Sequence, residues 1–412
     1  MSARAAELDR DDGLARFRAE FELEPGGPLY VDGNSLGRLP VRTRDRLGAL
    51  VDEWGTELVR GWHSWIDLPT DVGDLLGRHV LGARPGETLV ADSVTVNLYK
   101  LVRAVLAARP TRRVVVTDRT NFPTDRYVLA GLDAEVRLFD PDPIAGPTPE
   151  EVAAACSAGD VGLVTLSHVS YRSGALADLP AITAAAHDAG GLILWDVSHS
   201  AGAVEINLAE HGVDLAVGCT YKYLCAGPGA PAFLSVRTDL QEELRSPIQG
   251  WFGQREQFAM ERAYEPAEGI ARFLAGTPPI LGLVAVEAGV ELVAEAGIGA
   301  IAKKARALTA FGVERFDERL APLGLELGTP RDPEHRGAHL AFRHREEAWR
   351  ICRALIERAA VIPDFRGPDT IRFGFPPLAT SFAEVEESIE RLSDVVERGL
   401  FRDVDPERTR VT

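Results

Sequence analysis

An aspartate and a lysine, each at the end of an apolar run, are the residues of this sequence whose types and spacing point to chemistry. Asp196 follows residues 192–195, and Lys222 lies 26 positions further on. An interval of this length is about what one connecting helix and the next strand occupy in an α/β unit. A lysine amine can form a Schiff base with an aldehyde, and a carboxylate can keep a pyridine nitrogen protonated, as pyridoxal phosphate requires. Taken singly, Asp196 is better read as a helix cap and Lys222 as a surface lysine.

Hydroxyl groups at the starts of predicted helices are candidate phosphate contacts. Ser93 and Thr95 follow a strand and open a helix that runs to about residue 108. The free N–H groups and partial positive charge of a helix N-terminus favour an anion. Capping alone would explain one hydroxyl, whereas two together with Asn97 favour phosphate. Thr277, before a proline pair that opens a long helix, is a second candidate.

Strands and helices alternate through the first two thirds of the chain. A buried strand at 113–118 precedes Asn121, Phe122, Pro123, Thr124 and Asp125, and a second β-rich run at 161–169 contains Ser167. This alternation is typical of a parallel sheet with right-handed crossovers, and ligands collect beyond the carboxyl ends of its strands.

Three further segments carry residues suited to a substrate. Arg372 lies in a short predicted strand, where a guanidinium could hold a carboxylate, although alone it reads as a surface arginine. His63 stands between two tryptophans, one of them Trp65, which suits a planar substrate or equally a packed domain boundary. Ser35 lies at the tip of a glycine-bounded loop.

Composition narrows the class of protein. The 412 residues carry a net charge of −17 and no concentrated basic patch, which argues against nucleic-acid and anionic-membrane partners. Four cysteines without metal spacing indicate reduced thiols and a cytoplasmic location. Residues 1–12 lack the apolar core of a signal peptide. The most apolar helix candidate, at about 282–302, carries glutamates at four-residue spacing, so we expect it to be amphipathic.

The pattern predicts an α/β protein of two domains. Residues 61–283 hold the alternating strands and helices and form the expected large domain. Residues 284–412 change to amphipathic helices and short strands and form an expected small α+β domain. Residues 1–60 are expected to contribute to the small domain.

Six short motifs, in order and over nearly the whole chain, resemble those of kynureninase, a member of the aspartate-aminotransferase-like superfamily of pyridoxal phosphate enzymes (fold type I). They lie at residues 32–37, 121–125, 196–202, 221–224, 250–251 and 276–279. The resemblance implies a large domain with a mainly parallel seven-stranded sheet, a small C-terminal α+β domain, pyridoxal 5'-phosphate as cofactor, and a homodimer with active sites at the subunit interface.

The resemblance also assigns roles to individual residues. Lys222 would bind the cofactor and move protons, Asp196 would pair with the pyridinium, and Arg372 would hold the substrate α-carboxylate. Phe122 would stack on the ring. Further cofactor contacts would come from Val94, Thr95, Thr124, Asp125, Ser167, His199, Tyr221, Trp251 and Thr277, of which Trp251 and Thr277 would reach a neighbouring subunit. Ser35, His63 and Trp65 would line the substrate pocket.

The chain departs from the family pattern at three positions. Cys225 and Ser170 stand where asparagine is usual, and Ala379 stands where tyrosine is usual. Each is expected to bear on the substrate side chain and not on the cofactor, because a lost polar donor can shift specificity by orders of magnitude.

Three functions are compatible with these residues. The leading one is hydrolysis of kynurenine, or of a ring-substituted relative, to an anthranilate and alanine. The second keeps the cofactor but acts on a cysteine conjugate or another bulky amino acid, by β-elimination or decarboxylation-linked deamination. The third is a pyridoxal-phosphate-binding regulator without turnover, which the combination of Asp196, His199, Lys222 and Arg372 disfavours.

Overall fold

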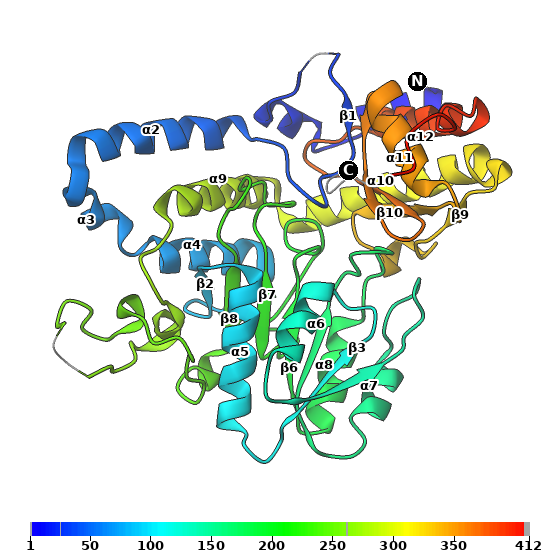
Figure 1. Ribbon diagram of the computed structural model, residues 1–412. Coiled ribbons are helices and arrows are strands. Elements are labelled where there is room, and N and C mark those ends of the chain that lie inside the picture. The colour runs from blue at the N-terminus through cyan, green and yellow to red at the C-terminus, as the bar shows by residue number, and fades with distance from the viewer. Residues whose placement is uncertain (1, 25, 261–262, 408–412) are drawn as a thin grey trace.

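A seven-stranded sheet forms the centre of the larger part of the protein (Figure 1). The computed structural model describes residues 2–24, 26–260 and 263–407. The strand order is β2-β8-β7-β6-β5-β3-β4; the five strands from β7 to β4 are mutually parallel, and β8 runs antiparallel to both of its neighbours. The strands are β2 (Thr88–Val90), β3 (Val114–Asp118), β4 (Glu135–Phe139), β5 (Val161–Ser167), β6 (Leu192–Asp196), β7 (Leu215–Gly218) and β8 (Phe233–Val236). The predicted mainly parallel sheet is confirmed.

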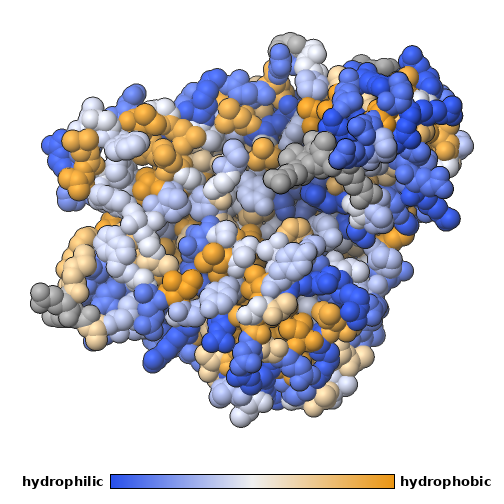
Figure 2. Space-filling model, in the orientation of Figure 1, coloured by the Kyte–Doolittle hydropathy of each residue, from blue (hydrophilic) through white to orange (hydrophobic). Residues whose placement is uncertain are grey.

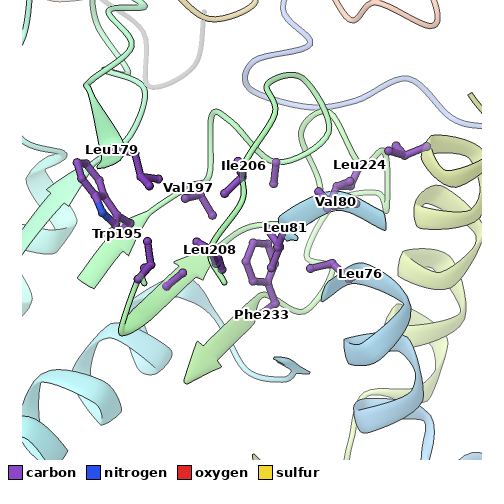
Figure 3. Close-up of a cluster of buried hydrophobic side chains, with 14 of the residues drawn as sticks. Leu76, Val80, Leu81, Leu179, Trp195, Val197, Ile206, Leu208, Leu224 and Phe233 are labelled. Atoms are coloured by element: carbon purple, nitrogen blue, oxygen red, sulfur yellow. The ribbon is translucent and has the colours of Figure 1, made fainter. Parts of the chain in front are cut away.

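Both faces of this sheet are buried, because successive side chains of a strand point to opposite sides. On β6, Ile193 and Trp195 join one apolar cluster, and Leu192 and Leu194 join another on the opposite face. Figure 3 shows part of the first cluster, in which Trp195 lies near Leu179 of the helix that follows β5. The covering helices are α4 (Leu68–Leu76), α5 (Val94–Ala108), α6 (Pro123–Ala130), α7 (Pro149–Ala155), α8 (Leu179–Asp188) and α9 (Ile280–Ala296).

The helices nearest the strand ends begin where their sequences predict. Ser93 caps α5: its backbone is extended and its hydroxyl accepts a hydrogen bond from the Val96 N–H. Proline occupies the first position of α6, where its fixed φ suits a helix start and its missing N–H costs nothing. These two starts fix the positions of the loops at 91–95 and 119–125.

A smaller antiparallel sheet, ordered β12-β13-β10-β9, lies beside the part that contains the seven-stranded sheet (Figure 1). The C-terminal helices and α1 surround it. Its strands are β9 (Glu326–Leu327), β10 (His339–Arg343), β12 (Asp364–Arg366) and β13 (Thr370–Gly374), and its helices are α1 (Ala3–Arg10), α10 (Ile298–Arg319), α11 (Ala348–Arg358) and α12 (Phe382–Glu397). A separate parallel pair joins β1 (Leu29–Tyr30) to β11 (Val361–Ile362).

A long helix, α2 (Val41–Glu57), crosses the molecule and is followed by the four-residue helix α3 (Trp62–Trp65) (Figure 1). Arg42 of α2 pairs with Glu295 of α9, and Arg46 pairs with Glu287 and Glu291. The glutamate stripe predicted to make residues 282–302 amphipathic therefore faces α2.

The prediction of a single helix at about 282–302 is wrong in its extent. The chain forms two helices there, α9 and α10, separated at Gly297. Gly297 has φ +81°, a conformation that glycine adopts without the steric cost of a side chain. No helix within the described residues is long and apolar enough to cross a membrane.

Two helical glycines make a matched test of this packing. A Cβ at Gly289 of α9 would lie 1.9 Å from the Leu224 carbonyl oxygen, whereas a Cβ at Gly48 of α2 would meet nothing within 4 Å. We expect Gly289→Ala to lower the free energy of unfolding by about 1–3 kcal/mol. Gly48→Ala should raise it by about 0.5–1 kcal/mol. Denaturant unfolding measures both, and equal effects would contradict the packing of α9 on the Lys222 loop.

Candidate functional site

The carboxyl ends of the parallel strands meet at a cavity of about 290 Å³. Ser167 ends β5 and lies directly opposite Asp196, which ends β6, in the register of the two strands. Lys222 follows the end of β7. The cavity brings together most of the cofactor contacts that the sequence predicts: Val94, Thr95, Phe122, Thr124, Asp125, Ser167, Asp196, His199, Tyr221 and Lys222.

Lys222 contacts a buried histidine. Its Nζ lies 3.0 Å from Nε2 of His199. Burial, followed by the charge of Lys222, holds the pKa of His199 well below its ordinary value, so the imidazole is neutral near pH 7. The neutral ring accepts a hydrogen bond from the lysine at Nε2, which fixes the direction in which the amine points.

Two carboxyl groups share the cavity wall beside Lys222. Asp196 accepts a hydrogen bond from the Ser198 N–H at 2.8 Å. Asp125 is fully buried, and neither of its carboxyl oxygens has a hydrogen-bond partner. Burial, and then the neighbouring Asp196, raise the pKa of Asp125 well above its ordinary value, while Lys222 acts in the opposite direction. A protonated ring nitrogen beside these groups would supply the missing donor.

The start of α5 provides the candidate phosphate contacts, with one correction. Val94 and Thr95 line the cavity, and the Thr95 side chain is exposed there. Ser93 also borders the cavity, although its hydroxyl caps the helix. Asn97 does not belong to the site, because it is buried and donates a hydrogen bond to the Ala91 carbonyl at 2.8 Å.

A tyrosine to which the sequence analysis gave no role completes one wall. Tyr171 lines the cavity and meets the Phe122 ring edge-on, with ring centroids 5.2 Å apart. Phe122 also lines the cavity, where its ring could stack on a planar ligand. No regular element contains Tyr171, so no periodic pattern marked it.

Arg372 lies just beyond the cavity and is held by an unpredicted acid. Its Nε donates to Asp364 at 2.6 Å, and its Nη2 contacts both Asp364 and the hydroxyl of Ser35. Its Nη1 donates to the Tyr171 carbonyl. Arg372 and Asp364 are cross-strand neighbours on β13 and β12. The sequence did not assign Asp364, because the pairing depends on the register of two strands.

Besides Arg372 and Ser35, which lie beside the cavity, four predicted site residues lie farther away from it. His63 is exposed, and Trp65 is buried against Trp62, with ring centroids 5.9 Å apart. Trp251 is 39% exposed and Thr277 is exposed. The segment of His63 and Trp65 lies close to the segment of Trp251, because the ring centroids of Trp62 and Phe252 are 6.1 Å apart. The chain thus divides its predicted site residues between the cavity and one separate surface region.

None of the three departures from the family pattern lines this cavity. Cys225 is buried behind the Lys222 loop, where its Sγ would lie 2.6 Å from a Cβ at Gly37. Its φ is +55°, and burial raises the pKa of its thiol to about 12. Ala379 is buried, and its carbonyl accepts a hydrogen bond from Arg18. Ser170 borders a small neighbouring cavity that shares Phe122 and Tyr171 with the main one.

The residues present fit pyridoxal phosphate. The cavity holds an amine for the aldehyde, unpartnered buried carboxyl oxygens for the ring nitrogen, an aromatic side chain for the ring, and a helix N-terminus for the phosphate. Within the described residues, no group of three or more histidine, cysteine or acidic side chains is placed to hold a metal ion.

Known proteins resemble the chain in sequence over nearly its whole length. The family model for the kynureninase C-terminal domain matches residues 301–392. The kynureninase of Pseudomonas fluorescens is 43% identical over 404 residues, which cover 95% of this chain and 94% of the relative. The kynureninase of Burkholderia pseudomallei is 42% identical over 415 residues, which cover 97% and 96%.

Solved structures resemble the chain in fold. A cysteine desulfurase from Thermococcus onnurineus has a TM-score of 0.76 at 18% identity, covering 95% of this chain and 98% of that one. A C-DES mutant with glycine covalently linked to its PLP cofactor has a TM-score of 0.81 at 18% identity, covering 92% and 99%. The predicted fold type I architecture is confirmed.

The buried carboxyl groups make the stability of the cofactor-free protein depend on pH. Asp125 has a raised pKa in the folded state, so the stability that its protonation contributes is complete below the unfolded value of about 4 and is lost as the pH rises above it. Asp125→Asn removes this titration. Relative to the variant, the wild type should lose up to about 1.4 kcal/mol of unfolding free energy per pH unit.

Denaturant unfolding of both cofactor-free proteins between pH 5 and pH 8 measures this difference. The control is Asp140→Asn, an exposed aspartate for which we expect no pH-dependent difference of this size. A constant gap between wild type and Asp125→Asn over this range would contradict the raised pKa.

Proposed function

The chain belongs to the kynureninase family, and we propose that it hydrolyses the Cβ–Cγ bond of kynurenine, or of a ring-substituted kynurenine, to an anthranilate and alanine, with pyridoxal phosphate as its cofactor. The observation that carries the proposal is the approach of Lys222 to within 3.0 Å of His199, in a cavity that also holds Asp125 and Asp196. The bound cofactor supplies an electron sink beside the substrate α-carbon.

The residues of the chain divide the remaining work. We propose that Lys222 would hold the cofactor and that the same Nζ would move the α-proton of the substrate. His199 accepts a hydrogen bond from that Nζ and keeps it directed into the cavity. Asp196 would keep the pyridine nitrogen of the cofactor protonated, and Asp125, whose carboxyl oxygens have no partner, would lie close enough to contribute to the same contact.

Other residues orient the ligands. Val94, Thr95 and Thr124 would hold the phosphate, and Phe122 would pack on the ring, since all four line the cavity. Arg372 would hold the substrate α-carboxylate with Ser35 beside it, which would fix the α-proton with respect to Lys222. Ser167 and Tyr221 complete the lining on the two sides of Asp196.

β-Elimination from a cysteine conjugate is the less favoured alternative. The solved structures of C–S bond-breaking enzymes share 17–18% identity with the chain and inform on fold alone. The relatives that share 42–43% identity over the whole chain are kynureninases. A regulator without turnover is disfavoured by the same relatives.

We propose a homodimer in which Trp251 and Thr277 serve the partner's cofactor phosphate, with His63 and Trp65 near the partner's substrate. Support comes from their position together, outside the chain's own cavity. Figure 2 shows apolar surface over α2 and α3, and exposed apolar side chains lie on α2, in the segment after it and in the loop after Trp251: Val51, Trp54, Leu58, Val59, Phe258 and Met260. Exposed apolar surface of this kind is typical of a protein interface.

Two further proposals concern the whole chain. We propose domain limits at 61–283 and 284–412 with 1–60 attached to the smaller domain, because Leu29 and Val31 pack in the apolar cluster of α10, α11 and α12. We propose a cytoplasmic location, because all four cysteines are unpaired and buried.

Turnover of kynurenine tests the proposed reaction. Purified protein supplied with pyridoxal phosphate should release anthranilate and alanine in equal amounts from kynurenine, or the corresponding products from 3-hydroxykynurenine. Lys222→Ala should lower kcat by about 10²- to 10⁴-fold or more. Lys303→Ala is the matched control, since Lys303 is exposed on α10. Inertness toward both substrates, with thiol and pyruvate released from a cysteine conjugate, would favour the alternative.

Mixing two defective variants tests the dimer. Lys222→Ala lacks the amine, and the double variant Trp251→Ala/Thr277→Ala lacks the residues proposed to act in the partner's site. A mixed dimer contains one intact site, so dissociation and random reassociation should restore about a quarter of wild-type activity. Mixtures that stay as inactive as the separate variants would show that each chain completes its own site.

A further inference from the structure

Arg372 has little free capacity to bind a substrate. Its hydrogen bonds to Asp364, to the Tyr171 carbonyl and to Ser35 number four and leave one of the five N–H groups of a guanidinium. Its side chain is 1% exposed. Although burial alone would raise the pKa of Asp364, the hydrogen bonds and charge of Arg372 hold it below its ordinary value. A bidentate contact with a carboxylate needs two N–H groups, so Arg372 would supply one hydrogen bond to the substrate carboxylate and a second donor would have to come from another residue.

A second arginine, Arg366, also pairs with Asp364, and its Nε–H has no hydrogen-bond partner. Arg366 lies two residues after Asp364 on β12, and therefore on the same face of the strand. Its Nη2 lies 2.7 Å from Oδ2 of Asp364. Its Nε is buried without a hydrogen-bond partner, yet the side chain as a whole is 41% exposed. A buried N–H without a partner is costly, and a bound carboxylate would remove that cost.

The Arg366 guanidinium is connected to the cavity wall through Asp364 and Arg372, because Arg372 donates a hydrogen bond to the carbonyl of Tyr171, which lines the cavity. Burial and the charge of Arg372 lower its pKa, whereas Asp364, Asp32 and Tyr171 act in the opposite direction. The pKa of Tyr221 is raised by Cys219 and by burial, and the Arg366 charge opposes that rise. Tyr171 and Tyr221 both line the cavity. The turn after Arg366 is tied to the same wall, because Arg172 donates a hydrogen bond to the Gly367 carbonyl.

The local charges favour an anion. Two guanidinium groups, Arg366 and Arg372, share one ionised carboxylate, Asp364. The nearby Asp32 is at most about half ionised at or below neutral pH, because burial and Asp364 raise its pKa to about 7. The cluster therefore carries a net positive charge beside a cavity that holds the cofactor contacts.

We propose that Arg366 is a second carboxylate-binding residue of the substrate site, which offers its unpaired Nε–H and a neighbouring N–H to the α-carboxylate while Asp364 keeps both guanidinium groups in place. Asp364 is then a positioning residue that the substrate does not displace. This assignment rests on the proposed function, in that the substrate is an α-amino acid bound at Lys222.

Arg366→Gln tests the assignment. In holoenzyme, the variant should raise KM for kynurenine by about 10- to 100-fold, the loss expected for hydrogen bonds to a charged group. We expect kcat to change less than threefold, because the cofactor and Lys222 are untouched. Arg366→Lys keeps the charge but not the fork of donors, and should fall between wild type and Arg366→Gln. Arg345→Gln, which removes an exposed arginine of the same domain, should match wild type.

A binding measurement separates a direct contact from a loss of structure. L-Alanine and L-alaninamide are titrated into holoenzyme, and the change in cofactor absorbance gives each Kd. Arg366→Gln should weaken alanine by about 10-fold or more and leave alaninamide, which lacks the carboxylate, within twofold of wild type. Equal weakening of both ligands, or no weakening of alanine, would overturn the proposal.

The two proposals fail in different ways. The alanine titration needs no kynurenine cleavage, so an inactive wild type that binds alanine through Arg366 would refute only the proposed reaction. A wild type that cleaves kynurenine, with Arg366→Gln unchanged in KM, would refute only the role of Arg366.

Discussion

Two carboxyl groups buried side by side are the constraint on which the site depends. Asp125 lies on the first turn of α6 and Asp196 at the end of β6, so the sheet itself brings them together. Burial, and then the neighbouring Asp196, disfavour the charged form of Asp125, and the unpaired oxygens of Asp125 add a further cost. A cationic ring nitrogen next to them relieves both penalties. The cofactor-free fold is therefore destabilised by these two buried acids, and cofactor binding would remove that cost. Lys222 and His199 lie in the same cavity, with their side-chain nitrogens in contact.

The two parts of the chain meet at this site with different tasks. The large sheet carries the residues proposed to contact the cofactor, at its strand ends and on the first turns of α5 and α6. The small sheet supplies the guanidinium groups of β12 and β13. Arg372 donates a hydrogen bond to the Tyr171 carbonyl of the large part, and Arg172 of the large part donates one to the Gly367 carbonyl in the turn after β12. Glycines permit the close approach between the two parts: a Cβ at Gly37 would lie 2.2 Å from the Lys222 carbonyl oxygen, and one at Gly174 would lie 2.8 Å from the His339 carbonyl oxygen. Cofactor and substrate groups are thus held by separate sheets and aligned by packing.

The sequence was most informative where the chemistry coincides with a strand end or a helix start. Asp196, Ser167 and Thr95 are found this way, and the alternating pattern predicted the sheet that the structure has. Contacts that depend on register or on irregular backbone were not predictable, as with Asp364, which meets Arg372 only across a hairpin. Asn97 was misplaced, because a polar residue on the first turn of a helix can face the strand before it as easily as the ligand. The break at Gly297 was missed because apolar periodicity continues on both sides of it.

The central claim is that Lys222 is the residue that carries the cofactor. Borohydride reduction of the holoenzyme, followed by peptide mapping by mass spectrometry, locates the attachment directly, because reduction makes a Schiff base permanent. The account predicts one phosphopyridoxyl group per chain on the peptide that contains Lys222. Lys100 should stay unmodified, since it is buried and already bound to Asp92 and the Phe273 carbonyl. Attachment at Lys100 or at any other lysine, or no attachment at all, would contradict the claim.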